Sequence, residues 1–103
     1  MATKVSFFLG LSLLLLGTCV ALADPPLLHG AALVNACAAC HGPDGQSKGA
    51  IPSFNTLSKD RIVEALRAFR SGERQGTVMN RIAKGLEDVD IEAIAAYVTA
   101  PGN

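Results

Sequence analysis

The sequence predicts a small all-helical domain, and two features support this prediction. Apolar residues recur at the three- and four-residue spacing of an amphipathic helix, most clearly between residues 62 and 69. No segment alternates apolar and polar residues in the way that a half-buried strand does. A chain of 103 residues has room for one such domain.

Residues 1–23 have the features of a secretory signal peptide. They begin with one charge, Lys4, continue through an apolar run over residues 5–16, and end on Ala-Leu-Ala. The run is shorter than the roughly 20 residues that a membrane-spanning helix needs. We therefore expect cleavage after Ala23, export to the periplasm, a mature domain over residues 24–103 and no stable membrane insertion.

Two other uses of the N-terminal segment stay open. It could remain uncleaved as an anchor, or it could be a lipoprotein signal. Residues 16–19 read LGTC, which resembles a lipobox with Cys19 as the acylated residue, although threonine is unusual before the cysteine.

The charge balance excludes a strongly basic protein. Nine basic and nine acidic side chains cancel, and removal of residues 1–23 takes away only Lys4. The mature chain therefore lacks the basic footprint of a nucleic-acid-binding protein and has no strong steering field.

The first expected helix covers residues 27–40, which are rich in alanine and leucine. Gly30 is unfavourable inside a helix unless another backbone must approach closely. We therefore expect the last helix to cross the first at Gly30, close to Tyr97. Residues 42–56 are rich in Gly, Pro, Ser and Asn and predict a long loop.

A second helix is predicted from the N-cap residue Ser58 to Gly72. Its expected inward-facing residues are Ile62, Leu66 and Phe69, and its expected outward-facing residues are Lys59, Glu64, Arg67 and Arg70.

Residues 77–85 predict one or two helical turns that end at Gly85. The last helix is expected to begin near Asp88 and to stop before Pro101. Its expected inward-facing residues are Val89, Ile91, Ile94, Ala95 and Val98.

Residues 37–41 read CAACH and could hold a zinc ion, a redox-active thiol pair or a haem. Zinc usually needs four ligands, and the neighbours Cys40 and His41 would point about 100° apart on a helix. A thiol-exchange pair needs a lowered thiol pKa, but Cys37 and Cys40 come at the end of the helical pattern, where the helix dipole disfavours a thiolate.

The haem interpretation fits the spacing best, because C-x-x-C-H is the attachment signature of c-type haem. Cys37 and Cys40 are three residues apart, so both sulfurs lie on one helical face and can form thioether bonds to one porphyrin. His41 then ligates the iron from one side of the ring. A covalent apolar cofactor also suits a domain of this size, which rarely has a sufficient core of its own. The single motif predicts one haem c.

Met79 is the expected second axial ligand of the iron, because it is the one methionine outside residues 1–23. A thioether ligand favours reduced iron and raises the reduction potential. Core filling is the alternative use of Met79. The competing ligand, His29, shares a helix with the attachment motif and is expected to be a surface or packing residue.

Three further residues are candidates for supporting roles. A ligating histidine needs an acceptor for its second nitrogen, and the carbonyl of Pro52 is the candidate. Arg81 or Lys84 could neutralise a haem propionate, with a solvated basic surface as the alternative.

With these residues in place, the chain resembles the class I c-type cytochromes over its whole mature domain. The stretch FRSGERQGTVMNRIAKG is similar to the cytochrome subunit of flavocytochrome c sulfide dehydrogenase. The resemblance implies a small class I cytochrome c fold wrapped round one haem, attachment at Cys37 and Cys40, and axial ligands His41 and Met79. It also implies an FAD-containing flavoprotein partner that passes electrons from sulfide to this haem.

The expected function is transfer of single electrons, without catalysis by the chain alone. The chain would serve as the haem subunit of a sulfide-oxidising flavoprotein or as a freely diffusing carrier between redox complexes. A haem sensor or peroxidase-like protein, which needs an open iron position, and a thiol-redox protein are the remaining alternatives.

Overall fold

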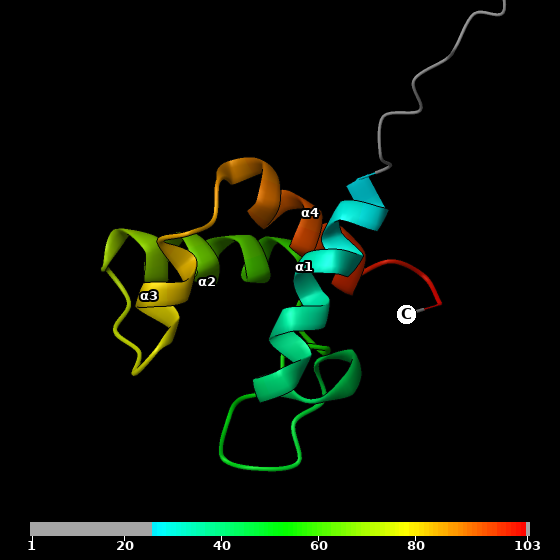
Figure 1. Ribbon diagram of the computed structural model, residues 1–103, viewed down its shortest axis with the longest axis horizontal. Helices are drawn as coiled ribbons and strands as arrows, with labels where there is room; N and C mark the ends of the chain where they lie inside the picture. The colour runs from blue at the N-terminus through cyan, green and yellow to red at the C-terminus, as the bar shows by residue number, and fades with distance from the viewer. Residues whose placement is uncertain (1–25, 103) are drawn as a thin grey trace, which may run out of the picture.

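The computed structural model describes residues 26–102, and all regular structure in this range is helical. The elements are α1 (Pro26–His41), the 3-10 turn η1 (Pro43–Gly45), α2 (Lys59–Ser71), α3 (Met79–Ala83) and α4 (Asp88–Val98). The expected all-helical fold is therefore confirmed (Figure 1). The signal peptide expected in residues 1–23, the cleavage site after Ala23 and the alternative lipidation of Cys19 lie outside the described residues.

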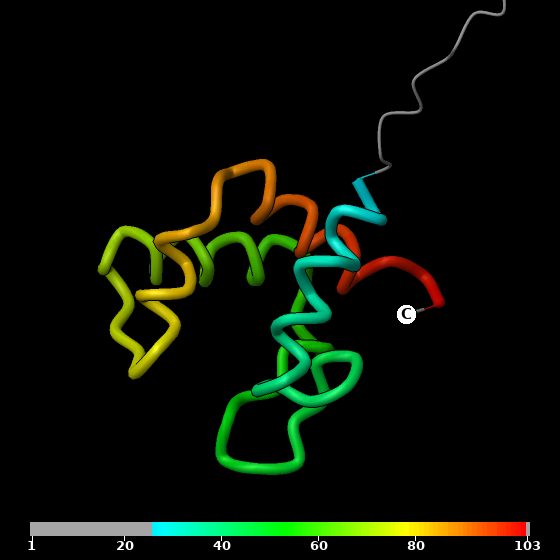
Figure 2. The backbone as a smooth tube through the Cα atoms, viewed as in Figure 1, coloured from blue at the N-terminus to red at the C-terminus, as the bar shows by residue number. Residues whose placement is uncertain are grey.

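The first and last helices cross at a glycine, as the sequence predicts. Gly30 is buried in α1, and a Cβ atom built on it would lie 2.8 Å from the Cβ of Tyr97 and would also meet the backbone oxygen of Ala93. The two segments lie side by side although they are far apart in the chain (Figure 2). The crossing brings the N-terminal half of α1 onto α4.

Helix α2 begins and ends at the predicted residues. The Oγ of Ser58 accepts a hydrogen bond from the backbone N–H of Arg61 at 3.4 Å, which satisfies one of the free donors at the helix start. Gly72 ends the helix in the left-handed conformation, with φ of 84°. Ile62 and Val63 are buried against α4 as part of the core.

The polar face of α2 is paired with α4. Arg70 donates hydrogen bonds to the carbonyl of Leu86 at 3.1 Å and to the carboxylate of Asp88 at 2.6 Å. Arg67 and Lys59 both form ion pairs with Glu92. Three of the four charged residues that the sequence predicts to face outward therefore join the two helices at the surface.

Helix α4 confirms four of the five expected inward-facing residues and contradicts the fifth. Ile91, Ile94 and Ala95 are buried, and Val98 packs against them. Val89 is 63% exposed, so the prediction that it faces inward is wrong. Residues two apart on a helix point about 200° away from each other, so Val89 cannot share the face of Ile91.

The core of the described residues is small. Its buried apolar residues are Val34, Ile62, Val63, Ala83, Ile91, Ala93, Ile94 and Ala95. Among them Ile91 is the one large side chain that is fully buried. Several apolar side chains on the loop and α3 are at least 39% exposed: Ile51, Leu57, Val78 and Ile82.

Between residues 26 and 102, no helix combines the length and the apolar character that crossing a membrane requires.

Candidate functional site

The CAACH motif forms the C-terminal end of α1. Cys37 is half-buried, Cys40 is exposed, and neither is in a disulfide. The thiol of Cys37 donates a hydrogen bond to the carbonyl of Leu33 at 3.5 Å, within the same helix. The two sulfurs are therefore free to react and are carried by one rigid element, as the spacing predicts.

The environment of Cys37 disfavours thiol exchange. Burial raises the pKa of the Cys37 thiol above its usual value, and a hydrogen bond from the backbone of Cys37 itself opposes this shift only in part. Thiol-exchange proteins need the opposite shift, because the thiolate is the nucleophile. No group of three His, Cys, Asp or Glu side chains in residues 26–102 is arranged to hold a metal ion.

The loop after the motif holds the ring of His41. Its Nδ1 lies 2.6 Å from the carbonyl oxygen of Pro52, the acceptor that the sequence predicts. A carbonyl can only accept, so Nδ1 is the donor and Nε2 is left with a lone pair that can bind a metal. The ring of Phe54 packs on His41 with centroids 5.2 Å apart. His41 is therefore fixed in both tautomer and orientation.

The short turn η1 sets the path of this loop. Gly42 and Gly45 have φ of 87° and 72°, and a Cβ atom on Gly45 would collide with the ring of Phe54. The N–H of Phe54 donates to the carbonyl of Gly45 at 3.0 Å. The turn, which the sequence predicts only as part of a long loop, thus positions Phe54 next to His41.

Met79 is half-buried and is the first residue of α3. Its segment is held by Asn80, whose Nδ2 donates to the carbonyls of Phe69 at 2.8 Å and Arg74 at 2.7 Å. The Oδ1 of Asn80 accepts from the N–H of Gly76 at 2.8 Å. One side chain thus joins α2, the following loop and α3. Sequence reasoning missed this role because no sequence motif marks these three hydrogen bonds.

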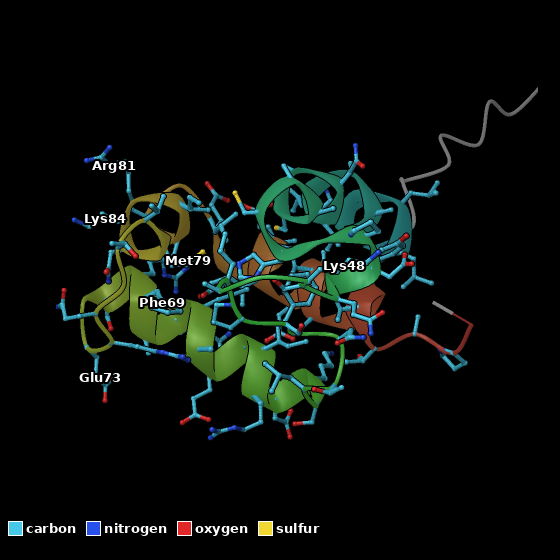
Figure 3. All side chains as sticks on the ribbon, turned by 90° about the horizontal axis from the view of Figure 1, so that it is seen from below. Lys48, Phe69, Glu73, Met79, Arg81 and Lys84 are labelled. Atoms are coloured by element: carbon cyan, nitrogen blue, oxygen red, sulfur yellow. The ribbon has the colours of Figure 1, made fainter. Side chains whose placement is uncertain are left out.

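Helices α1 and α3 lie on the same side of α2. In Figure 3, α3 lies over the C-terminal end of α2, with Met79 between α3 and the rest of the molecule. Arg81 and Lys84 extend from α3 in the opposite direction, into solvent. Both cations are exposed in the structure, and their interaction with a haem propionate stays a prediction.

His29 lies at the opposite end of α1 from His41. Its Nε2 is 2.7 Å from the carboxylate of Asp90, which also caps α4 by accepting from the N–H of Glu87. These two interactions lower the pKa of Asp90, with the cap as the larger cause. His29 is a packing residue between two helices, as expected.

Comparison with known proteins decides the family. A family model described as cytochrome c matches residues 27–100, almost all of the described structure. The chain belongs to the cytochrome c family. Proteins of this family bind haem c covalently and transfer electrons.

The chain is similar to three proteins that are named as cytochromes or as a cytochrome subunit. The cytochrome subunit of sulfide dehydrogenase from Chlorobaculum tepidum is 46% identical over 69 residues, which are 67% of this chain and 63% of that protein. A cytochrome c-553 from Helicobacter pylori is 45% identical over 69 residues, 65% of this chain and 72% of the relative. A cytochrome c-554(548) from Halomonas halodenitrificans is 38% identical over 71 residues, 65% of this chain and 86% of the relative. This cytochrome thus spans less than two thirds of the sulfide dehydrogenase subunit.

The described residues fit the haem c that the family binds. Two free thiols, a histidine with one nitrogen available and a methionine thioether make up the donor set of a covalently attached haem with two axial ligands. The exposed apolar side chains of Ile51, Leu57 and Val78 lie on the segments next to Pro52 and Met79 and suit contact with an apolar ring.

Proposed function

We propose that this cytochrome binds one haem through thioether bonds of Cys37 and Cys40 and through axial ligation by His41 and Met79. The main support for the proposal is the hydrogen bond of 2.6 Å from His41 to the Pro52 carbonyl, because it orients the imidazole and leaves its Nε2 available to bind a metal. When bound, the haem supplies one-electron chemistry of its iron.

Each residue of the site has a distinct task in this proposal. The two cysteines near the end of α1 would hold the haem covalently, and Pro52 and Phe54 orient the imidazole of His41 that would bind its iron. Asn80 positions the Met79 segment on the other side. With both axial positions filled by protein, substrate has no access to the metal, which suits electron transfer and disfavours a sensor or peroxidase-like function.

For the physiological role, we favour the haem subunit of a sulfide-oxidising FAD flavoprotein. The relative from Chlorobaculum tepidum is a cytochrome subunit of sulfide dehydrogenase, and this chain has no strong net charge with which to speed diffusional encounter. The alternative is a freely diffusing carrier, since other relatives are named cytochrome c-553 and cytochrome c-554(548), without mention of a dehydrogenase. Export to the periplasm with cleavage after Ala23 is part of the proposal and rests on the pattern of residues 1–23.

The haem ligands are tested by expression with export in a host that matures c-type cytochromes. The processed chain should gain the full mass of one haem and give the pyridine haemochrome spectrum of a thioether-linked haem. Cys37→Ser with Cys40→Ser should abolish both signals.

Met79→Ala should keep the covalent haem, lower the reduction potential and lose the near-infrared band of a sulfur–ferric iron bond. A Met79→Ala variant with an unchanged potential would remove Met79 from the proposed site.

The partner is tested separately by affinity purification of the tagged cytochrome from its native host. We expect a stoichiometric FAD-containing chain and sulfide-dependent reduction of the haem in the purified complex. Recovery of the haem-loaded cytochrome without a flavoprotein would favour the freely diffusing carrier and leave the haem site intact.

A further inference from the structure

Helix α3, which begins with Met79, has few contacts of its own to hold it in place. It covers only Met79–Ala83, and isolated helices shorter than about 12 residues are marginal in water. Ala83 is its one buried residue, while Val78 just before it and Ile82 within it are 57% and 45% exposed. No side chain caps its first turn. The position of Met79 therefore depends on contacts that anchor α3 to other segments.

The side chain of Asn80 supplies such an anchor with every polar group that it has. Its Nδ2 donates to the carbonyls of Phe69 at 2.8 Å and Arg74 at 2.7 Å, and its Oδ1 accepts from the N–H of Gly76 at 2.8 Å. A carbonyl can only accept and a backbone N–H can only donate, so the amide has a single orientation that satisfies all three partners. The side chain thus closes residues 69–80 into one hydrogen-bonded unit.

Close packing supports the same unit. A Cβ atom built on Gly76 would lie 2.9 Å from Cε1 of Phe69 and 3.5 Å from the Cβ of Met79, so glycine lets the loop approach both residues. The guanidinium of Arg74 covers the Phe69 ring, 4.6 Å from its centroid. Met79 projects from the side of α3 that faces the rest of the molecule (Figure 3). The loop is therefore fixed right next to the thioether.

We infer that Asn80 holds the Met79 thioether in the second axial position and thereby closes that position to small ligands. The inference rests on the proposed ligation by His41 and Met79 and adds a positioning residue to it. A soft thioether suits reduced iron better than ferric iron, so its retention in the ferric state depends on the protein. Met79 and Asn80 are neighbours in α3, so the backbone at Met79 can withdraw only if the hydrogen bonds of Asn80 break.

The test is a titration of the ferric, haem-loaded protein with imidazole, which competes with Met79 for the iron. The apparent affinity of a competing ligand is proportional to the fraction of molecules in which the position is open. Asn80→Ala removes all three hydrogen bonds and should bind imidazole at least tenfold more tightly than the wild type, with loss of the near-infrared sulfur–iron band. A tenfold change is about 1.4 kcal/mol, close to the net contribution of a single hydrogen bond.

Two further variants separate the clamp from a general effect on the loop. Asn80→Asp keeps the size of the side chain and an acceptor for Gly76, but its oxygens face the two carbonyls, so its affinity for imidazole should also rise. Gln75→Ala is the matched control. The Nε2 of Gln75 donates to the carbonyl of Gly72 at 2.8 Å, so this amide belongs to the same loop but does not reach α3. Its removal should leave the affinity for imidazole unchanged.

The outcomes divide as follows, with the circular dichroism of each variant showing whether the helices are retained. Equal imidazole affinity in the wild type and Asn80→Ala would overturn the inference, because the thioether would then leave by rotation of its side chain alone. An equal gain in Gln75→Ala would also overturn it. A covalently loaded, helical Asn80→Ala that lacks the near-infrared band even without imidazole would support it. If Asn80→Ala does not load haem, Asn80→Asp decides the question.

Failure of this inference is distinct from failure of the proposed haem site. A wild-type chain without covalent haem, or a Met79→Ala variant that keeps the near-infrared band and the potential of the wild type, would overturn the proposed site and the inference with it. A wild type with haem and a Met79-dependent band, combined with an Asn80→Ala variant of wild-type imidazole affinity, would overturn the role of Asn80 alone.

Discussion

Gly30 places two helices in direct contact because it has no side chain. A Cβ atom at this position would lie 2.8 Å from the Cβ of Tyr97 and would press on the backbone carbonyl of Ala93. Glycine costs about 1 kcal/mol relative to alanine inside a helix, so the sequence carries a local penalty here. The penalty is offset by the burial that the crossing allows, with Ala93 and Ile94 both buried on α4.

This balance predicts the sign of a Gly30→Ala substitution. The variant should gain helix propensity of about 1 kcal/mol, but overpacking in a close contact costs about 1–3 kcal/mol, and a backbone carbonyl cannot move aside as a side chain can. We expect a net loss of up to about 2 kcal/mol in the free energy of unfolding, measured by denaturant titration. Gly49→Ala is the control, since a Cβ atom there meets nothing within 4 Å. Equal stability of the two variants would show that α1 and α4 are farther apart than the structure has them.

At the scale of elements, α2 and α4 are joined by charge as well as by their apolar faces. Asp88 accepts from Arg70 and lies 3.5 Å from Arg67, while Glu92 pairs with Arg67. The hydrogen bond and charge of Arg70 hold the pKa of Asp88 below its ordinary value, with a smaller contribution from Arg67. The same residues that the helical pattern assigns to the solvent face therefore orient one helix on the other.

The lowered pKa gives a direction for the pH dependence of stability. A carboxylate whose folded pKa lies below its unfolded value, about 3.9 for Asp, stabilises the fold above that value. The contribution is lost as pH falls from the unfolded pKa through the folded one. Unfolding titrations between pH 6 and pH 2 should therefore show a shallower acid loss of stability for Asp88→Asn than for the wild type.

The control for this pH measurement is Asp44→Asn, because no ion pair to Asp44 is recorded within residues 26–102. Asp44 has φ of 55°, a conformation that asparagine also tolerates. This variant should keep the acid slope of the wild type. Because the α2–α4 pairs are exposed, added salt should reduce the difference between wild type and Asp88→Asn. Identical slopes in all three proteins would mean that the pairs with Arg70 and Arg67 contribute nothing in solution.

At the scale of the whole molecule, the described polypeptide supplies only part of a core. Three of its buried apolar residues are alanines, and none of its larger side chains apart from Ile91 is fully buried. Small domains bury a small fraction of their surface and commonly depend on a metal or another crosslink. A covalently held haem next to Ile51, Leu57 and Val78 would add the missing apolar contacts.

We therefore expect folding to depend on the haem. The Cys37→Ser, Cys40→Ser protein should lose most of its far-UV circular dichroism at 222 nm and its cooperative thermal unfolding. Met79→Ala, which keeps the covalent haem, should retain most of the helical signal. The comparison separates loss of the cofactor from loss of one side chain. A haem-free protein with native helical content and a sharp transition would show that the polypeptide core is sufficient by itself.

The sequence by itself determined the helices and the chemistry of the attachment motif, because both depend on residues near one another in the chain. Spacing of apolar residues located α2 and α4, and the caps at Ser58 and Gly72 follow from local hydrogen bonding. The carbonyl of Pro52 was predicted as the partner of His41 because the loop that carries it must cross on the side of His41.

Only the tertiary structure decided which side chains meet across distant segments. Val89 has the apolar character of a core residue, but it lies on the face of α4 turned away from Ile91. The hydrogen bond of Asn80 to Phe69 and the pairing of His29 with Asp90 depend on how the helices pack against one another. The spacing of apolar residues indicates the face of a helix on which a residue lies, but it does not indicate which element packs against that face. These contacts therefore follow only from the arrangement of the packed helices.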